Sequence, residues 1–279
     1  MLWLDTGLTI YLTALALIMG AVMGSFLNCM AWRIAHGESV WKGRSHCATC
    51  GHKLGVLDLI PVFSWMFLRG RCRYCHEKIS PRYMFTEMFM AVVFVSILYR
   101  WNVSLTGLRF MLYSCVLLVA ALVDLECFEI PDSCHVVGIL IWIATLPWVQ
   151  TLSLEQESVG HMAADGLAGG LIIAGALLVL SLIFDKVLGK ESLGGGDIKL
   201  LFVTGLYLGL AGNLLNLIVS CILGLLFAVT LAKKNHPDPG SEEDVPAQAI
   251  PWGPSIACAT WICMIVGQYV TKWYLGLFY

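Results

Sequence analysis

Long uncharged apolar runs are the feature that most limits how this chain can fold. No Asp, Glu, Lys or Arg occurs in the 27 residues from Thr6 to Trp32. A helix of that length spans the hydrocarbon core of a bilayer, about 30 Å thick, with room for some tilt. Further apolar segments follow at approximately 84–100, 107–125, 133–149, 166–185, 199–212, 214–232 and 254–277. The pattern predicts an all-α polytopic membrane protein with about eight transmembrane helices.

The composition supports a membrane protein and disfavours a nucleic-acid partner. Of the 279 residues, 58% are hydrophobic and 13% are charged, against about 25% charged in a typical soluble domain. The basic residues gather around cysteines and do not form the continuous stripe that binds nucleic acid. The first apolar run lacks the basic segment of a cleavable signal peptide, so we interpret it as a retained helix in contact with membrane lipid.

The number of spans is ambiguous in one place. Residues 199–232 could form one long helix or two short ones, and Gly212 and Asn213 offer a polar turn in the middle. With eight spans, 14 of the 17 Lys and Arg residues fall on one side of the membrane. Because positive charge is enriched in cytoplasmic loops, this distribution favours eight spans and identifies the basic side as cytoplasmic.

Only one loop is long enough to fold by itself. The predicted organisation is a first transmembrane helix at 1–33, a cytoplasmic zinc-binding domain at 34–83, and a seven-helix membrane domain at 84–279. The loop at 34–83 is polar and basic, and it separates the first apolar run from the second. We therefore expect it to lie in the cytoplasm and to form a small domain around its cysteines.

The loop contains two CxxC pairs, Cys47 with Cys50 and Cys72 with Cys75, separated by 21 residues. Two such pairs provide the four thiolates of a tetrahedral structural zinc site, and the metal would supply folding free energy to a loop with little core. A pair of disulfides is the alternative, but disulfides are rare in the cytoplasm. Three neighbouring histidines are alternative ligands: His46, His52 and His76.

Two aspartates lie on the same predicted side of the membrane, one at the end of an apolar segment and one at the start of another. The uncharged run before Asp124 begins at Phe110 and has only 14 residues, fewer than the about 20 of a full crossing, so we expect Asp124 to lie within the membrane thickness near the cytoplasmic face. Asp197 begins the segment at 199–212 on that same face. Carboxylates at such depth are costly and usually serve function.

Two neighbouring carboxylates share one proton and can act as acid and base, which is the chemistry of aspartic proteases. Gly194, Gly195 and Gly196 precede Asp197 and would let an extended peptide approach its carboxylate. The residues alone leave other interpretations open. Each aspartate could be a helix cap or interfacial residue, and the pair could serve a proton- or cation-coupled transporter with a zinc-stabilised cytoplasmic cap.

Several motifs together resemble the bacterial type IV prepilin peptidases, which are intramembrane aspartic proteases of the GxGD class. The resemblance rests on the double CxxC and on GAVMGSFLNCMAWR (20–33), DLIPVFSW (58–65), GRCRYC (70–75), ISPRYMFTE (79–87), VDLECFEIPD (123–132), GGGDIK (194–199) and PWGP (251–254). These motifs extend from residue 20 to about 200 in the order that the family shows, and PWGP is similar to the family's proline-containing entry to its last helix.

The resemblance implies an enzyme of the bacterial inner membrane. It would cleave the basic leader from prepilins or pseudopilins after a glycine, at the cytoplasmic face. It would also methylate the new N-terminal residue with S-adenosylmethionine, and serve a type IV pilus or type II secretion machinery. The family's catalytic aspartates map onto Asp124 and Asp197, and its cysteine tetrad onto Cys47, Cys50, Cys72 and Cys75. Asp132 is the second choice for the first aspartate.

Other residues of the matched motifs have open roles. Gly20 and Gly24 form a GxxxG pattern that permits close packing of helices. Asn28 lies one turn farther along and could bond across the bundle or help to hold a cofactor. Arg33 could anchor the helix end, and Glu87 could pair with a basic residue of the zinc loop or belong to a methylation site.

Overall fold

The computed structural model describes residues 5–40, 43–47, 49–152, 158–189, 193–234 and 251–276. These residues form helices, with two isolated β-bridges and no strand among them. The chain divides into two compact units, Met1–Cys115 and Val116–Tyr279. The predicted all-α class is confirmed.

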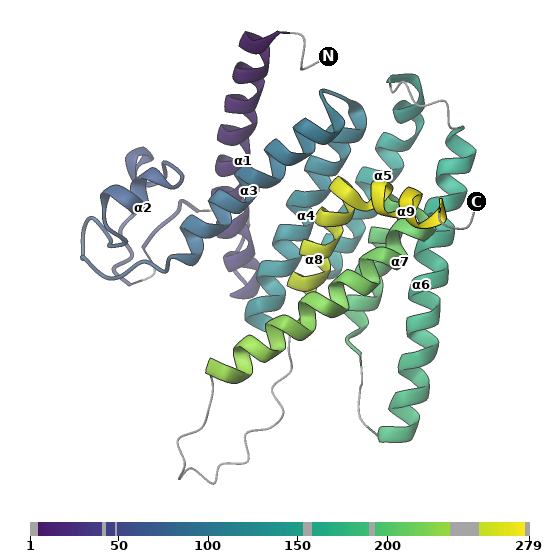
Figure 1. Cartoon of the computed structure of the whole chain (residues 1–279). Coiled ribbons are helices and arrows are strands. Elements are labelled where there is room, and N and C mark those ends of the chain that lie inside the picture. Colours follow the sequence, from purple (N-terminus) through teal and green to yellow (C-terminus); the bar gives the residue numbers. More distant parts are fainter. Residues whose placement is uncertain are drawn as a thin grey trace. The chain divides into compact units, whose positions relative to one another are not determined.

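The first unit contains two long helices joined by the cysteine loop (Figure 1). Its elements are α1 (Thr6–Ala35), η1 (Val56–Asp58), α2 (Phe63–Phe67), α3 (Arg82–Trp101) and the first part of α4 (Leu105–Cys127). The carboxylate of Asp5 caps α1 by accepting the backbone N–H of Gly7 at 2.8 Å.

Helices α1 and α3 pack against each other through glycine. A Cβ atom on Gly20 would lie 2.6 Å from the carbonyl oxygen of Met90, and one on Gly24 would lie 2.9 Å from the Cα atom of Glu87. Neither position has room for a side chain, so the two backbones are in direct contact. The GxxxG prediction for Gly20 and Gly24 is therefore confirmed.

The second unit is a helical bundle that begins with the last turns of α4 (Figure 1). Its further elements are α5 (Asp132–Leu152), α6 (Val159–Leu188), α7 (Gly195–Lys234), α8 (Gly253–Ile262), the π-helical turn η2 (Cys263–Gly267) and α9 (Gln268–Leu275). Helix α6 packs along the part of α7 that precedes Gly209, and α7 also packs on α8.

Helix α7 folds back on itself at Gly209, which has a φ of +71°. The side-chain amide of Asn213 donates to the carbonyl of Leu201 at 3.0 Å. These residues would be about 18 Å apart along one straight helix. The predicted turn at Gly212 and Asn213 is wrong in position, because Asn213 is fully buried and bonded to the preceding segment. The prediction of two segments between 199 and 232 is correct.

Small residues also allow the first segment of α7 to pack on α6. A Cβ atom on Gly166 would lie 2.7 Å from the carbonyl oxygen of Leu206, and one on Gly170 would lie 2.7 Å from that of Phe202. As the α6 number rises, the α7 number falls, so the two helices are antiparallel. This register places the start of α7, where Asp197 is found, beside the middle of α6.

The described helices match the expected number of spans. Six are long and apolar enough to cross a membrane, and α5 contributes a shorter apolar helix over Asp132–Trp148. The long helix α7 counts twice because it folds back at Gly209. This gives eight apolar segments, as the sequence predicted.

Candidate active site and metal centre

Asp124 and Asp197 come from different helices of the second unit. Asp124 lies in the last turn of α4 with 4% of its surface exposed, and Asp197 lies in the first turn of α7. The two carboxyl groups are close enough for their charges to interact. The helix ends therefore place two acidic groups in one site.

The carboxylate of Asp124 is held by the start of α8. Its Oδ2 atom accepts the backbone N–H of Gly253 at 2.8 Å. Gly253 is the first residue of α8, so the positive end of that helix dipole points at the carboxylate. A Cβ atom on Gly253 would lie 2.7 Å from the same oxygen, so only glycine permits this contact. The N–H of Gly253 and the positive end of the α8 dipole both stabilise a negative charge on Asp124.

The carboxyl group of Asp197 has a different environment. Its Oδ1 atom is buried and has no hydrogen-bond partner among the described residues. A buried oxygen without a donor is poorly suited to negative charge and well suited to carry a proton. The environments of Asp124 and Asp197 are therefore unequal, as an acid and a base require.

The three glycines before Asp197 differ in what surrounds them. A Cβ atom on Gly194 would lie 2.9 Å from Oδ2 of Asp197, and one on Gly196 would lie 3.2 Å from Cβ of Ile130. A Cβ atom on Gly195 would meet nothing within 4 Å, so the backbone there is open. The predicted approach of a peptide remains a prediction, and Gly195 is where the structure leaves space for it.

Two nearby residues stabilise the start of α7. His135 donates from Nε2 to the carbonyl of Gly196 at 3.1 Å, which requires the proton on that nitrogen. Asp132 accepts from Nζ of Lys199 at 2.7 Å, and its side chain is 75% exposed. Asp132, the rival candidate, is thus an exposed ion-paired residue at the start of α5, whereas Asp124 is buried beside Asp197.

The cysteine loop of the first unit gathers its four predicted ligands. The Sγ atoms of Cys47, Cys50, Cys72 and Cys75 all lie within 4.8 Å of one another. The sulfurs of Cys47 and Cys75 are 3.9 Å apart. A tetrahedral zinc ion with Zn–S bonds of about 2.3 Å would separate its sulfurs by about 3.8 Å, so the cluster fits that ion. All four thiols are free, which excludes the disulfide alternative in this structure.

The two CxxC pairs form matching turns. The backbone N–H of Gly51 donates to the carbonyl of Cys47 at 2.9 Å, and that of His76 donates to the carbonyl of Cys72 at 3.0 Å. Gly51 has a φ of +68° and His76 a φ of +60°. The residue after each CxxC pair therefore has a left-handed backbone conformation, and His76 is a turn residue. The candidate metal ligands that lie together are the four cysteines, with no histidine among them.

The thiols of the cluster cannot all ionise unaided. The backbone N–H of Cys50 lowers the pKa of Cys47 to about 7. The N–H of Glu77 favours the thiolate of Cys75, but desolvation and the neighbouring sulfurs outweigh it and raise the pKa of Cys75 to about 12. A divalent cation would offset this repulsion among the sulfurs.

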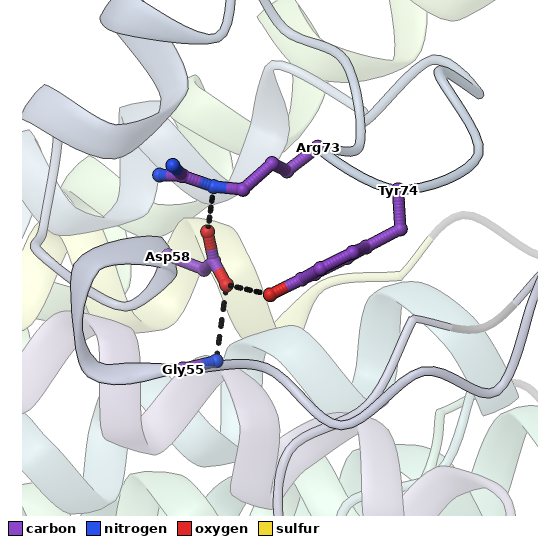
Figure 2. A network of polar contacts seen from close by, with 4 residues as sticks. All are labelled: Gly55, Asp58, Arg73 and Tyr74. Carbon is purple, nitrogen blue, oxygen red and sulfur yellow. Dashed lines mark hydrogen bonds and ion pairs between the residues drawn. The ribbon is translucent and has the colours of Figure 1, made fainter.

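A polar network holds the second turn against η1 (Figure 2). The carboxylate of Asp58 accepts from Nε of Arg73 at 2.6 Å, from the hydroxyl of Tyr74 at 3.1 Å and from the backbone N–H of Gly55 at 3.0 Å. Desolvation would raise the pKa of Asp58, but these donors outweigh it and hold that pKa below its usual range. The ring of Tyr74 also lies against that of His52, with centroids 3.6 Å apart and the planes tilted by 31°, so Tyr74 links both turns.

Three residues whose roles the sequence did not decide form hydrogen bonds within the first unit. Asn28 donates to the hydroxyl of Thr86 at 2.7 Å, which joins α1 to α3. Arg33 donates to the carbonyls at positions 40 and 43 and so ties the loop to the end of α1. Glu87 accepts the backbone N–H of Val62 at 2.6 Å. Each serves a contact within the chain.

Sequence reasoning missed three residues that the site depends on. Gly253 lies in the PWGP motif, which the resemblance interpreted only as the entry to the last helix, and its glycine before proline at a helix start was the available signal. In the sequence, His135 is only a polar residue within an apolar segment, and nothing there indicated its bond to Gly196. Asp58 is an acidic residue in a polar loop, which is typical of a solvated side chain.

The fold and the site define an integral membrane protein with paired carboxylates at helix ends and, in the other unit, a cluster of four cysteines that could hold a metal ion. Residues 18–101 match the family model described as Bacterial Peptidase A24 N-terminal domain, and residues 111–229 match the Type IV leader peptidase family. The chain belongs to the type IV leader peptidase family.

Named relatives agree with this family. The chain is 34% identical over 234 residues to the type 4 prepilin-like proteins leader peptide-processing enzyme of Escherichia coli, covering 77% of this chain and 84% of the relative. It is 32% identical over 236 residues to a prepilin leader peptidase/N-methyltransferase of Aeromonas hydrophila, covering 84% and 76%. A Pseudomonas putida protein of that name is 28% identical over 280 residues, covering 92% of each chain. No solved structure is significantly similar.

Proposed function

We propose that this protein cleaves the leader peptide of type IV prepilins or pseudopilins after a glycine and N-methylates the new N-terminal residue. Membership of the type IV leader peptidase family supports this activity, as do the names of the relatives. The observation that carries the proteolytic half is the pairing of Asp124 and Asp197 in unequal environments.

In the proposed mechanism, Asp124 is the base and Asp197 the acid. The N–H of Gly253 and the start of α8 stabilise a charged Asp124, which takes a proton from water. The water oxygen attacks the carbonyl carbon of the scissile bond. Asp197 donates its proton to the leaving amine as the C–N bond breaks, and proton exchange with water restores the pair.

The four cysteines would hold one zinc ion in a structural site, because all four ligand positions are filled by protein sulfur. Zinc there would fix the two turns of the loop. S-adenosylmethionine supplies the methyl group in the methylation activity. Asn28 and Glu87 are engaged in contacts between α1, α3 and the loop, so they do not form an open site for that donor, and we assign no residue to it.

We place the enzyme in the bacterial inner membrane with its cysteine loop and aspartates toward the cytoplasm. The distribution of Lys and Arg supports that orientation, with 14 of 17 on the side of the loop. The proposed partners are prepilins or pseudopilins of a type IV pilus or type II secretion machinery, and membrane lipid. A transporter is not favoured, because Asp124 and Asp197 lie in terminal turns and transport sites lie near the bilayer midplane.

Mass spectrometry of a purified prepilin incubated with this protein and S-adenosylmethionine tests both activities. We expect loss of the leader and one added methyl group on the mature chain. Asp197→Asn should abolish leader loss while leaving the helical content unchanged. A wild-type protein that leaves every prepilin tested intact, in detergent and in lipid, would refute the proposed function.

A further inference from the structure

A cluster of fully buried polar side chains lies inside the second unit. Thr204 is on the first segment of α7, Asn213 and Asn216 are on the segment after Gly209, and Thr260 is on α8. Each of the four polar residues has 0% of its surface exposed. Their helices are long and apolar enough to span a membrane, where a polar group without a hydrogen-bond partner is costly. Their hydrogen bonds therefore constrain how these helices pack.

Asn216 bonds two helix segments at once. Its Nδ2 atom donates to the hydroxyl of Thr204 at 3.3 Å, and its Oδ1 atom accepts from the hydroxyl of Thr260 at 3.3 Å. The hydroxyl of Thr260 shares its proton with the carbonyl of Ile256, which is 2.7 Å away in the same helix. The side chain of Asn216 is therefore a bridge between the first segment of α7 and α8.

Asn213 fixes the other side of the same segment. Its Nδ2 atom donates to the carbonyls of Gly169 on α6 and Leu201 on α7, each at 3.0 Å, and its Oδ1 atom accepts from the hydroxyl of Thr204 at 2.9 Å. The part of α7 after Gly209 is thus bonded to α6, to the preceding part of α7 and to α8. It is the common support for the helices that carry the aspartate site.

Both partners of the Asn216 bridge are seven residues from the site. Thr204 follows Asp197 by seven positions on α7, and Thr260 follows Gly253 by seven positions on α8. Seven residues make almost two full turns and about 10 Å of helix rise. Each threonine therefore lies on the same face of its helix as the site residue, and the bridge joins the two helices at one level behind the site.

A second contact holds the start of α8 on the same segment of α7. The indole Nε1 atom of Trp252 donates to the carbonyl of Ser220 at 3.2 Å. Trp252 directly precedes Gly253, and Ser220 lies about one turn beyond Asn216. Helix α8 is thus attached to α7 at its start and again two turns farther along. A shift of α8 along α7 would break both contacts.

We propose that Asn216 is a positioning residue, because its bridge between α7 and α8 sets the place of Asp197 relative to Asp124. The backbone N–H of Gly253 holds the carboxylate of Asp124 at 2.8 Å, so a shift of α8 along α7 would move that carboxylate relative to Asp197. Asn216 acts through its threonine partners and not on the reacting atoms. This inference rests on the proposed function, because it requires the two aspartates to act as one pair.

Asn216→Ala removes the bridge and leaves its partners bonded. The hydroxyl of Thr204 keeps the carbonyl of Leu201 as an acceptor, and that of Thr260 keeps the carbonyl of Ile256. We expect kcat for leader cleavage to fall about tenfold, because small displacements of a catalytic group are costly. The KM for prepilin should stay within about twofold of the wild type, because no substrate contact is removed.

Two substitutions of Thr260 separate the hydrogen bond from packing. Thr260→Val keeps the shape and removes the hydroxyl, whereas Thr260→Ser keeps the hydroxyl and removes a methyl group. We expect kcat to fall about tenfold in Thr260→Val and to stay near the wild-type value in Thr260→Ser. Thr145→Val on α5 is the matched control, because the hydroxyl of Thr145 bonds to carbonyls of its own helix. It should leave kcat and KM unchanged.

Three results would overturn the inference while the proposed function stands. The first is a wild-type kcat in Asn216→Ala. The second is a loss in Thr260→Ser that equals or exceeds the loss in Thr260→Val, because packing of the methyl group would then decide the rate. The third is a fall in kcat that disappears when rates are divided by the fraction of folded protein. If the wild-type protein itself cleaves no prepilin, the proposed function fails, and the inference fails with it.

Discussion

In the cysteine loop, the outermost ligands Cys47 and Cys75 are 28 positions apart, and short turns bring them together. In the aspartate site, Asp124 and Gly253 are 129 positions apart and meet through the packing of separate helices. The loop therefore depends on its turns and, in our proposal, on a metal ion. The aspartate site depends on helix contacts that a single methyl group can disturb.

Removing one cysteine ligand should have the largest effect on the loop. Cys72→Ser should reduce bound zinc from one ion per chain to almost none, because three thiolates form an incomplete site. Structural zinc contributes about 10–16 kcal/mol of apparent binding free energy in zinc-finger peptides, so the loop should lose its amide-exchange protection. Elemental analysis and hydrogen exchange measure these two results.

Cys221→Ser is the control for that experiment, because Cys221 is exposed on α7 and belongs to the second unit. It should leave the zinc content at one ion per chain. Full zinc content and full protection of the loop in Cys72→Ser would contradict a structural site made of four cysteines.

A single added methyl group should disturb the aspartate site. In Gly253→Ala, the new Cβ would lie 2.7 Å from Oδ2 of Asp124, so the carboxylate must move. Small displacements of a catalytic group can cost about a hundredfold, and we expect cleavage to fall roughly tenfold to a hundredfold. Initial rates of leader loss measure this effect.

The matched control is Gly267→Ala, in the same C-terminal helical region. Its new Cβ would meet Cβ of Cys263 at 3.5 Å, an ordinary contact distance. Cleavage should stay near the wild-type rate. Equal rates in Gly253→Ala and Gly267→Ala would show that the contact to Asp124 does not position a catalytic group.

The sequence was informative where the chemistry is local or unusual for its surroundings. The spacing of Cys47, Cys50, Cys72 and Cys75 predicted the cluster because each pair forms its own turn. Asp124 was singled out because a carboxylate in an apolar segment is costly. These features are visible in a short stretch of chain, before any packing is known.

The sequence was uninformative where tertiary contacts decide a residue's role. Gly209 and Gly212 look alike in sequence, but only Gly209 adopts a positive φ and lies against Gly169. Asn213 resembles a turn residue and is instead buried with its amide bonded to the carbonyls of Leu201 and Gly169. The contact of Gly253 with Asp124 likewise depends on where α8 begins.

A smaller effect is expected from the network around Asp58. Asp58→Asn would replace a carboxylate that accepts from Gly55, Arg73 and Tyr74, and would leave donors poorly paired. We expect the loop to lose roughly 2 kcal/mol of stability by hydrogen exchange in the zinc-loaded protein. Glu77→Gln, at an exposed position of the same loop, should change stability little. Equal effects of the two variants would show that the network contributes nothing.

The smallest effect concerns the residue after each CxxC pair. Gly51 and His76 both adopt a positive φ, which favours glycine. Gly51→Ala should destabilise the loop by about 1 kcal/mol through backbone strain alone, because its Cβ would meet nothing within 4 Å. His76→Gly should stabilise the loop by no more than about 1 kcal/mol, and both changes are measurable by hydrogen exchange. A stabilising effect of Gly51→Ala, or a destabilising effect of His76→Gly, would contradict the matching turns.

The most direct test of the central claim compares cleavage by Asp124→Asn, by Asp197→Asn and by the double variant. If the two carboxylates act as one acid–base pair, each single variant should lose at least about a hundredfold in rate, and the double variant should lose no more than the worse single variant. Either single variant cleaving prepilin at the wild-type rate would contradict the account. Multiplicative losses in the double variant would show two groups acting independently.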